Sequence, residues 1–335
     1  MQKLLNQPGS YVDETLDGIL LAHGDVLRRV DDEPRAIVRR DAGTRTKVAI
    51  VTGGGSGHLP LFLGYVGEGL ADGCAVGNLF ASPSAQQMLA VMRAVSTGPG
   101  ILQLYGNYSG DRLNFDIAAR MAGAEGIEST TALGADDVAS APPHSRVDRR
   151  GVAGIAFAYK TAGAAAEEGG SLEEVTDIAQ RTLTRTRSMG VALAPCVLPT
   201  VGEPNFEVEP GFMELGMGIH GEPGVSRGPL ERADAVVDEM WEAIIGDFDD
   251  SLGESVAVLV NGLGATPSEE LYIMYRRVAQ RAEAAGLRIV RSHVGEYATS
   301  LEMVGASISV LALDDDLERL LRAPARFWPS RFLQT

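Results

Sequence analysis

The stretch Val48-Ala49-Ile50-Val51-Thr52-Gly53-Gly54-Gly55-Ser56-Gly57-His58 decides how this chain is interpreted. Its apolar beginning predicts a buried strand, and the glycines predict a turn whose backbone N–H groups a small polar ligand can approach closely. A histidine in such a turn is placed for chemistry rather than for packing. A second glycine-rich stretch, Gly216-Met217-Gly218-Ile219-His220-Gly221-Glu222-Pro223-Gly224, also carries a histidine. We therefore expect one site assembled from both halves of the chain.

The composition is that of a globular protein large enough for two domains. The chain has 335 residues, of which 45% are hydrophobic and 22% are charged, a length that exceeds the usual size of one domain. Its formal net charge is −16. A field of that sign repels nucleic acid and anionic lipid, so we expect neither as a partner and favour a neutral substrate.

Cysteine content and hydropathy indicate the cellular compartment in which the protein is expected. Cys74 and Cys196 are the only cysteines, too few for a disulfide framework or a four-cysteine zinc site, and we expect two buried thiols in a reducing environment. The sequence contains no apolar run of about 18 residues and no apolar leader. These features predict a soluble, cytoplasmic protein that does not enter a membrane.

Alternating strand and helix patterns predict an α/β fold. The expected strands are 48–51, 100–104, 256–261, 287–292 and 308–313, and the expected helices are 12–30, 84–95, 117–126, 172–189, 232–245 and 268–286. We predict two α/β domains with mainly parallel or mixed sheets and flanking helices. Prolines and glycines interrupt the periodicity at 190–206, so we divide the chain into an N-terminal domain, 1–190, and a C-terminal domain, 191–335. Residues 246–251 are expected to form an acidic surface loop.

A glycine-rich turn after a strand first suggests nucleotide binding, but both common signatures fail. The dinucleotide fingerprint needs glycine where His58 stands, and no P-loop sequence occurs. A small ligand therefore fits this turn better than ATP. The other histidines, His23, His144 and His293, show no metal-ligand spacing, and we expect no metal site.

Three polar positions have both structural and chemical interpretations. His58 either satisfies loop carbonyls or acts as a hydrogen-bonding or acid–base group, and its glycine context favours the second. Asp111 follows the strand 100–104 and, taken alone, is better explained as a helix N-cap than as a proton acceptor. The pair Asp136-Asp137 is best explained as structural. His220, with glycines close on both sides, can attack an electrophilic carbon or move protons.

Taken together, these motifs resemble the substrate-binding subunit or domain of the dihydroxyacetone kinases. The resemblance runs from Asn6 to the neighbourhood of Ser330. It rests on the segments 53–58, Phe80-Ala81-Ser82-Pro83, Asn107-Tyr108-Ser109-Gly110-Asp111, Leu113-Asn114-Phe115, Asp136-Asp137, Arg149-Arg150-Gly151-Val152-Ala153-Gly154, Lys160, 162–164, 216–224 and Asn261-Gly262-Leu263-Gly264, in family order.

The resemblance implies roles for the polar residues. It implies that His220 bonds covalently to the ketone carbon of a short ketose as a hemiaminal, which separates ketoses from polyols of similar size. His58 and Asp111 are implied to hydrogen-bond the substrate hydroxyl and to assist its deprotonation. The expected substrate contacts are Gly54, Gly55, Ser56, Gly57, Ser82 and Gly218.

The resemblance also implies partners for a phosphotransferase in glycerol metabolism. Family members transfer phosphate with an all-helical nucleotide-binding domain or subunit, so ATP or ADP with Mg²⁺ is expected on that partner and no cofactor on this chain alone. Some family systems use ATP and others a phosphoenolpyruvate-fed relay; the sequence leaves this open. A homodimer is common in the family.

Two departures from the family pattern bear on the substrate. Leu59 stands where the family has glutamate after the histidine, and Gly106 stands where it has lysine. A wider pocket that admits a tetrulose is one consequence, and altered activity is another. The alternative functions are a catalytically inactive ketose-sensing paralogue that activates a transcription regulator and, disfavoured by the failed fingerprint, a nucleotide-dependent oxidoreductase.

Overall fold

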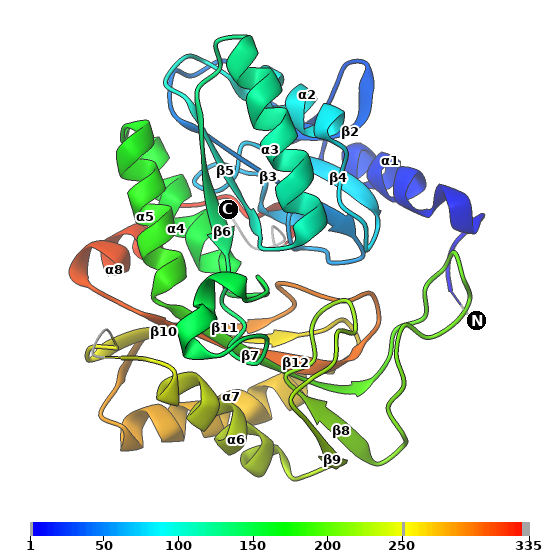
Figure 1. Ribbon diagram of the computed structural model, residues 1–335, viewed down its shortest axis with the longest axis vertical. Helices are drawn as coiled ribbons and strands as arrows, with labels where there is room; N and C mark the ends of the chain where they lie inside the picture. Colours follow the sequence, from blue (N-terminus) through cyan, green and yellow to red (C-terminus); the bar gives the residue numbers. More distant parts are fainter. Residues whose placement is uncertain (1–2, 250–251, 330–335) are drawn as a thin grey trace. The chain divides into compact units, whose positions relative to one another are not determined.

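The computed structural model describes residues 3–249 and 252–329 and divides by its contacts into two compact units (Figure 1). The described residues of unit 1 are 3–133, 158–181 and 320–329. Those of unit 2 are 134–157, 182–249 and 252–319. The chain thus passes between the units several times. The domain boundary expected at residue 190 stays a prediction, although it would cut a strand that lies wholly in unit 2.

Unit 1 is built on a six-stranded mixed sheet. In chain order its strands are β1 (Leu27–Val30), β2 (Glu33–Arg39), β3 (Ala49–Ser56), β4 (Gly73–Leu79), β5 (Ile101–Gly106) and β6 (Ser129–Gly134). They lie side by side in the order β1-β2-β4-β3-β5-β6. The central strand β3 is parallel to both of its neighbours, β4 and β5, whereas β2 is antiparallel to β1 and β4.

Helices α2 and α3 cover one face of this sheet (Figure 1). The helices of this part of the chain are α1 (Tyr11–His23), α2 (Ala85–Val95), α3 (Ser109–Ala124), α4 (Ile155–Glu167) and α5 (Leu172–Thr184). Met88 and Met92 of α2 and Phe115 of α3 are fully buried against the strands. Ser84 caps α2 reciprocally with Gln87, which confirms the helix start expected after Pro83.

Unit 2 contains a second six-stranded mixed sheet, ordered β11-β10-β12-β7-β8-β9. Its strands are β7 (Thr186–Ala194), β8 (Phe212–Leu215), β9 (Ser226–Pro229), β10 (Ser255–Gly262), β11 (Arg288–Gly295) and β12 (Val304–Ala312), and its helices are α6 (Ala233–Gly246), α7 (Ser268–Ala284) and most of α8 (Asp315–Arg322). Only β10 and β11 are parallel; the other described pairs are antiparallel. Apolar residues of α6 and α7, Trp241 and Val278 among them, pack on the sheet.

The expected fold class is confirmed, but three element boundaries were wrong. The helix expected over 12–30 ends at His23, and 27–30 form strand β1. The helix expected over 172–189 ends at Thr184, because 186–194 pair with β12 as strand β7. The helix expected from residue 117 begins at Ser109. In each case sheet pairing or a turn set the boundary, and helical periodicity does not detect either.

The expected acidic surface loop at 246–251 was wrong for Asp247. Its carboxylate is buried and accepts hydrogen bonds from Arg149, at 2.7 and 2.8 Å, and from Arg187, at 2.6 Å. These arginines are themselves 1% and 4% exposed. Residues 250 and 251 lie outside the described part of the chain. An acidic residue can lie in the protein interior when arginines from distant segments neutralise its charge.

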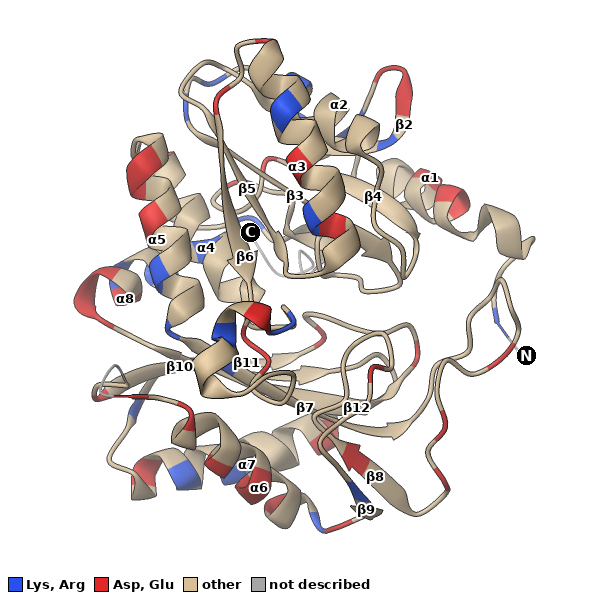
Figure 2. Ribbon diagram, in the orientation of Figure 1, with Lys and Arg blue, Asp and Glu red and all other residues tan. Residues whose placement is uncertain are grey.

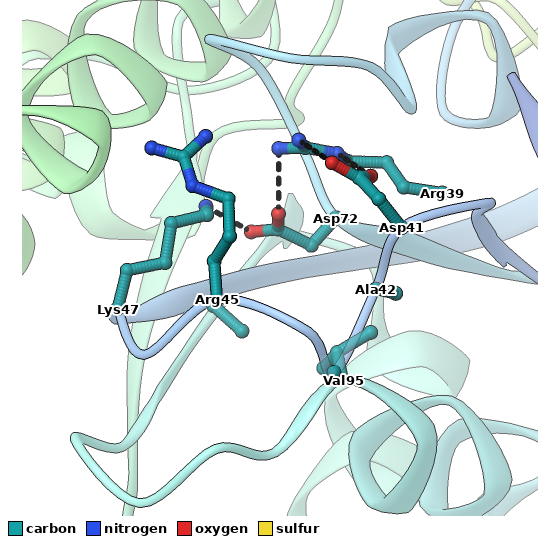
Figure 3. A pocket seen from close by; sticks show the side chains of 9 residues that line it. Arg39, Asp41, Ala42, Arg45, Lys47, Asp72 and Val95 are labelled. Atoms are coloured by element: carbon teal, nitrogen blue, oxygen red, sulfur yellow. Dashed lines mark hydrogen bonds and ion pairs between the residues drawn. The ribbon is translucent and has the colours of Figure 1, made fainter.

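A charged network lies at the amino ends of β3 and β4 in unit 1 (Figure 3). Arg39 donates to Asp41, to Asp72 at 3.1 Å and to Glu167 at 2.7 Å, and Lys47 Nζ lies 2.8 Å from Asp72 Oδ2. Arg39 and Asp72 are both nearly inaccessible. Each of these acidic groups pairs with a basic group, so the network links the segments at the beginnings of β3 and β4.

The surface carries the acidic excess on its helices. Asp and Glu outnumber Lys and Arg on α5 and α8, where acidic residues occupy the first turns (Figure 2), a position that the helix dipole favours. Both cysteines are buried thiols, as expected. Within the described ranges, none of the helices has the length and apolarity that a bilayer span requires.

Candidate functional site

The unit 1 residues of the candidate site lie at one edge of its sheet. Strands β4, β3 and β5 are adjacent and parallel, so their carboxyl ends meet at the same edge, where ligands bind in open α/β sheets. The three segments that leave these ends are 57–60, 80–83 and 107–111. They contain His58, Ser82 and Asp111, which are far apart in sequence. The charged network around Arg39 lies at the opposite edge.

The glycines before His58 belong to the strand rather than to the turn expected from the sequence. Strand β3 continues to Ser56. A Cβ atom on Gly54 would lie 2.2 Å from the Phe62 ring, and one on Gly55 would lie 2.7 Å from the backbone nitrogen of Ala81. The turn begins only at Gly57, whose φ is +102°. These glycines therefore let two neighbouring segments approach the strand end.

His58 is 1% exposed and lies between two aromatic rings. Its imidazole stacks on Phe80, with centroids 4.8 Å apart and planes at 16°, and meets the edge of Phe62 at 6.3 Å. Both phenylalanines have positive φ, 52° and 65°, a costly conformation for a bulky residue that persists only where the surroundings impose it. Both segments thus have a strained backbone at the phenylalanine that packs on the His58 ring.

Asp111 is not the helix N-cap that residue-level reasoning favoured. Helix α3 has Tyr108 at its N-cap, without a side-chain cap, and Asp111 lies in the first turn with its side chain buried. Burial first, and then the carboxylates Asp116 and Asp111, raise the pKa of Tyr105. Asp111 is thus a carboxylate near other buried polar groups, at a helix N-terminus that stabilises negative charge.

Ser82 is brought against the start of α3. A Cβ atom on Gly110 would lie 2.7 Å from Ser82 Oγ, and Asn114 Nδ2 donates to the carbonyl of Pro83 at 2.8 Å. Ser56 Oγ donates to the carbonyl of Gly77 at 2.8 Å. The structure therefore brings the expected unit 1 residues to adjoining segments, and the small residue 110 permits the contact.

His220 lies in unit 2, in the loop between β8 and β9. Its side chain is 25% exposed, and its Nδ1 lies 3.0 Å from Glu222 Oε1. The backbone N–H of His220 donates to Glu222 Oε2 at 2.9 Å. Gly218 leaves room for this carboxylate, because a Cβ atom there would lie 2.2 Å from Glu222 Oε2. Gly221 has φ +84°, which glycine adopts without strain.

The ionisation state of Glu222 determines which ring nitrogen of a neutral His220 carries the hydrogen. Burial alone would raise the pKa of Glu222, but its hydrogen bond with His220, the charge of His220 and backbone N–H groups together lower that pKa to about 2. An ionised carboxylate only accepts hydrogen bonds, so Nδ1 must be the donor. The lone pair of a neutral His220 imidazole is therefore on Nε2, the nitrogen away from Glu222.

Sequence reasoning missed Glu222 and the two phenylalanines. Glu222 stands two residues after His220 in the quoted glycine stretch, and a carboxylate at that spacing was the available signal. Nothing in the sequence distinguishes Phe62 from a core residue. Phe80 belongs to the quoted segment Phe80–Pro83, but only the fold shows that both rings pack on His58.

The remaining candidate residues make contacts that support the fold. Asp136 is fully buried and accepts backbone N–H groups of Val152 and Gly154, both at 2.9 Å, together with Ser188 Oγ. Its expected structural role is confirmed. His23 packs on Trp328 with ring centroids 4.5 Å apart. In the described ranges no group of three or more metal-binding side chains is found.

Comparisons with known proteins relate the chain to ketose kinases. The Dak1 domain matches residues 17–328. L-erythrulose kinase of Pectobacterium atrosepticum is 45% identical over 329 residues, which are 97% of this chain and 55% of that protein. The dihydroxyacetone-binding subunit DhaK of PTS-dependent dihydroxyacetone kinase 2 from Listeria innocua is 44% identical over 324 residues, 97% of both chains. The chain thus spans about half of the first relative and nearly all of the second.

Solved structures agree with this relationship. Dihydroxyacetone kinase of C. freundii superposes with a TM-score of 0.90 at 34% identity, covering 97% of this chain and 59% of that one. The dihydroxyacetone kinase operon co-activator Dha-DhaQ superposes with a TM-score of 0.86 at 30% identity, covering 93% and 96%. The resemblance inferred from the motifs is confirmed: the chain belongs to the dihydroxyacetone kinase (Dak1) family.

Proposed function

We propose that this chain is the substrate-binding part of a kinase for dihydroxyacetone or a related short ketose, and that it captures the ketose covalently on His220. The observation that supports this most strongly is the pairing of His220 Nδ1 with an ionised Glu222 at 3.0 Å. That pairing directs a nucleophilic Nε2 lone pair away from the carboxylate. The family membership supplies the substrate class.

The capture step balances without a cofactor. Nε2 attacks the ketone carbon, the N–C bond forms, and the C=O π electrons move to the oxygen, which takes a proton from water and becomes a hydroxyl. The imidazole becomes positive as the bond forms. The Glu222 carboxylate stabilises that charge and relays the Nδ1 proton to the hydroxide that the water leaves, so protons and charge balance. A polyol such as glycerol has no carbonyl for this reaction. The site therefore distinguishes chemically between substrates that differ little in size.

We further propose that His58 and Asp111 act on the hydroxyl that receives phosphate. His58 hydrogen-bonds it, and Asp111 accepts its proton as the phosphoryl group is transferred. The burial of both side chains and the fixed orientation of His58 support these roles. Gly54, Gly55, Ser56, Gly57, Ser82 and Gly218 are proposed to contact the bound ketose.

The phosphoryl donor is proposed to be held by a helical domain or subunit outside these 335 residues. ATP with Mg²⁺ and a phosphoenolpyruvate-fed relay are both compatible with the sequence, and the Listeria innocua relative is named as PTS-dependent. We place the reaction in the cytoplasm and propose that the chain acts as a homodimer.

Two substitutions bear on which ketose is bound. Gly106 ends strand β5 at the candidate edge of the sheet, and Leu59, 38% exposed, follows His58. Glycine removes the long side chain that the family pattern has at position 106. We propose that the chain accepts a four-carbon ketose as well as dihydroxyacetone. The similarity to an L-erythrulose kinase supports this proposal.

A second candidate function is ketose sensing without phosphoryl transfer. The structural similarity to the co-activator Dha-DhaQ favours it. Covalent capture on His220 serves either function, whereas the buried carboxylate of Asp111 favours catalysis. Turnover with a nucleotide-binding partner distinguishes the two.

Mass spectrometry of the protein incubated with dihydroxyacetone tests the capture. We expect an adduct one ketose heavier, stabilised by rapid cooling or mild acid-free conditions, and its loss in His220→Ala with unchanged thermal unfolding. Glycerol at the same concentration should give no adduct. A His220→Ala protein that still carries the ketose would overturn the proposed role of this residue.

A further inference from the structure

We propose that Arg150 and Asp137 form a positioning pair that holds the His220 loop in the shape needed for ketose capture. This inference rests on the proposed function, because it assigns the loop a shape that matters for the covalent step. Both residues, the loop and Glu222 lie in unit 2. Neither residue is needed to touch the ketose.

The pair is fixed and largely buried. Arg150 Nε and Nη2 lie 2.9 and 2.7 Å from Asp137 Oδ2, and the two side chains are 14% and 3% exposed. The backbone is tied in the same way: the N–H of Asp137 donates to the Arg150 carbonyl at 3.1 Å, and Ser140 Oγ accepts the N–H of Arg150 at 3.0 Å. The guanidinium therefore has one defined position.

From that position the guanidinium reaches the beginning of the His220 loop. Arg150 Nη2 also donates to the carbonyl of Gly216 at 3.0 Å. Gly216 has φ +76° and is the first residue after strand β8. The loop thus leaves strand β8 with Gly216 in a left-handed conformation. The Arg150 guanidinium holds Gly216 there through the hydrogen bond to the Gly216 carbonyl oxygen.

The same guanidinium also borders the carboxylate that holds His220. Arg150 Nη1 lies 3.9 Å from Glu222 Oε2. A Cβ atom on Gly218 would meet both groups, at 2.6 Å from Nη1 and 2.2 Å from Oε2. Glu222 therefore lies between the His220 ring and the Arg150 guanidinium.

The Arg150 guanidinium contacts the surroundings of His220 at two places. Its fork fixes where the loop begins, which a point charge on a flexible stem reproduces poorly. Its Nη1 also borders Glu222, whose carboxylate lies against Nδ1 of His220. Removal of Arg150 removes both contacts, so we expect the His220 ring to be held less well for attack on a carbonyl.

The test measures dihydroxyacetone adduct formation against ketose concentration in Arg150→Met, Arg150→Lys and Asp137→Asn. Arg276→Met is the matched control, because Arg276 pairs with Asp234 on the exposed surface of the same unit. Thermal unfolding is recorded for each variant, and adduct is expressed per folded molecule. Outer partners of functional histidines typically contribute roughly 10–100-fold, so we expect a loss of about tenfold or more in apparent affinity for Arg150→Met.

Further arms separate positioning from general stability. Arg150→Lys should recover part of the affinity, whereas Arg276→Met should leave it unchanged. In a Glu222→Gln background Arg150→Met should still lower the affinity, since Arg150 also binds the Gly216 carbonyl.

Each outcome decides between the alternatives. If the unaltered protein forms an adduct, and Arg150→Met and Asp137→Asn form it with the same affinity, the positioning pair is refuted while the proposed function stands. If neither the unaltered protein nor His220→Ala forms an adduct, the proposed function fails and this inference with it.

Discussion

At the scale of single residues, Glu222 fixes the ring of His220, the histidine that we propose as the nucleophile. Its carboxylate binds both the backbone N–H and the Nδ1 of His220, so the ring orientation and the tautomer have the same cause. The same relation between a carboxylate and a histidine recurs in enzymes of unrelated fold.

Glu222→Gln should therefore weaken ketose capture more than it weakens folding. Glutamine can donate to Nδ1 as well as accept from it, so the tautomer is no longer fixed, and we expect adduct affinity to fall by about tenfold or more. Titration of the adduct by mass spectrometry measures this. Glu209→Gln, an exposed carboxylate of the same unit, is the control. Equal affinities in the two variants would contradict the role of Glu222.

Asp111 supports a prediction about turnover. Asp111→Asn keeps the size of the buried side chain but cannot accept the hydroxyl proton, so we expect ketose binding to persist and turnover with a competent nucleotide-binding partner to fall by roughly 100-fold or more. A coupled assay of ketose phosphate formation, run beside adduct measurement, separates the two steps. Retained turnover would leave Asp111 with a structural role in α3 only.

At the scale of elements, the sequence predicted strands and helices better than their ends. The apolar run before Gly53 identified β3, yet the glycines proved to be part of the strand, because the approach of Phe62 and of the Phe80–Pro83 segment is visible only in the fold. Asp111 shows the same limit. A cap and a first-turn carboxylate differ by three positions, and residue preferences do not resolve that difference.

Asp247 at the end of α6 supports a prediction about stability. Asp247→Asn removes the charge that neutralises two buried guanidiniums, and loss of one partner of a buried pair costs about 3–5 kcal/mol. Burial raises the pKa of Asp247, but hydrogen bonds and charge from Arg149, Arg187 and Arg146 outweigh it and lower the pKa.

The sign of the pH effect follows from that lowered pKa. The carboxylate stabilises the fold above its unfolded pKa, and this contribution is lost as the pH falls through the folded value. Urea unfolding should show that Asp247→Asn is less stable at neutral pH and loses less stability in acid than the unaltered protein. Asp249→Asn, at a mostly exposed position, should stay within about 0.5 kcal/mol. Identical acid dependence in all three proteins would contradict the buried pairing.

At the scale of the whole molecule, acidic charge and the candidate chemistry suit a neutral substrate. The net charge is −16, and such a field does not attract anions but leaves a neutral ketose unaffected. In the proposed reaction the same field would repel a phosphorylated product. The fold class and the family could be predicted from the sequence, because both depend on motifs and composition rather than on tertiary contacts.

Substrate length is the property that the two departures from the family pattern should alter. A panel of ketoses from three to six carbons, tested for adduct formation, should show four-carbon ketoses binding within about tenfold of dihydroxyacetone. Gly106→Lys should lower binding of the four-carbon ketoses more than binding of dihydroxyacetone, because the long side chain takes up space. Unchanged selectivity in Gly106→Lys would show that position 106 does not set the length.

The most direct test of covalent capture is carbon NMR of dihydroxyacetone labelled with ¹³C at the ketone carbon. Bound to the unaltered protein, the labelled carbon should give a signal in the region of tetrahedral carbon, and with His220→Ala only the signals of free ketose and its hydrate should remain. A bound signal that stays in the carbonyl region, or a tetrahedral protein-bound signal, distinct from that of the free hydrate, that persists in His220→Ala, would contradict capture by this imidazole.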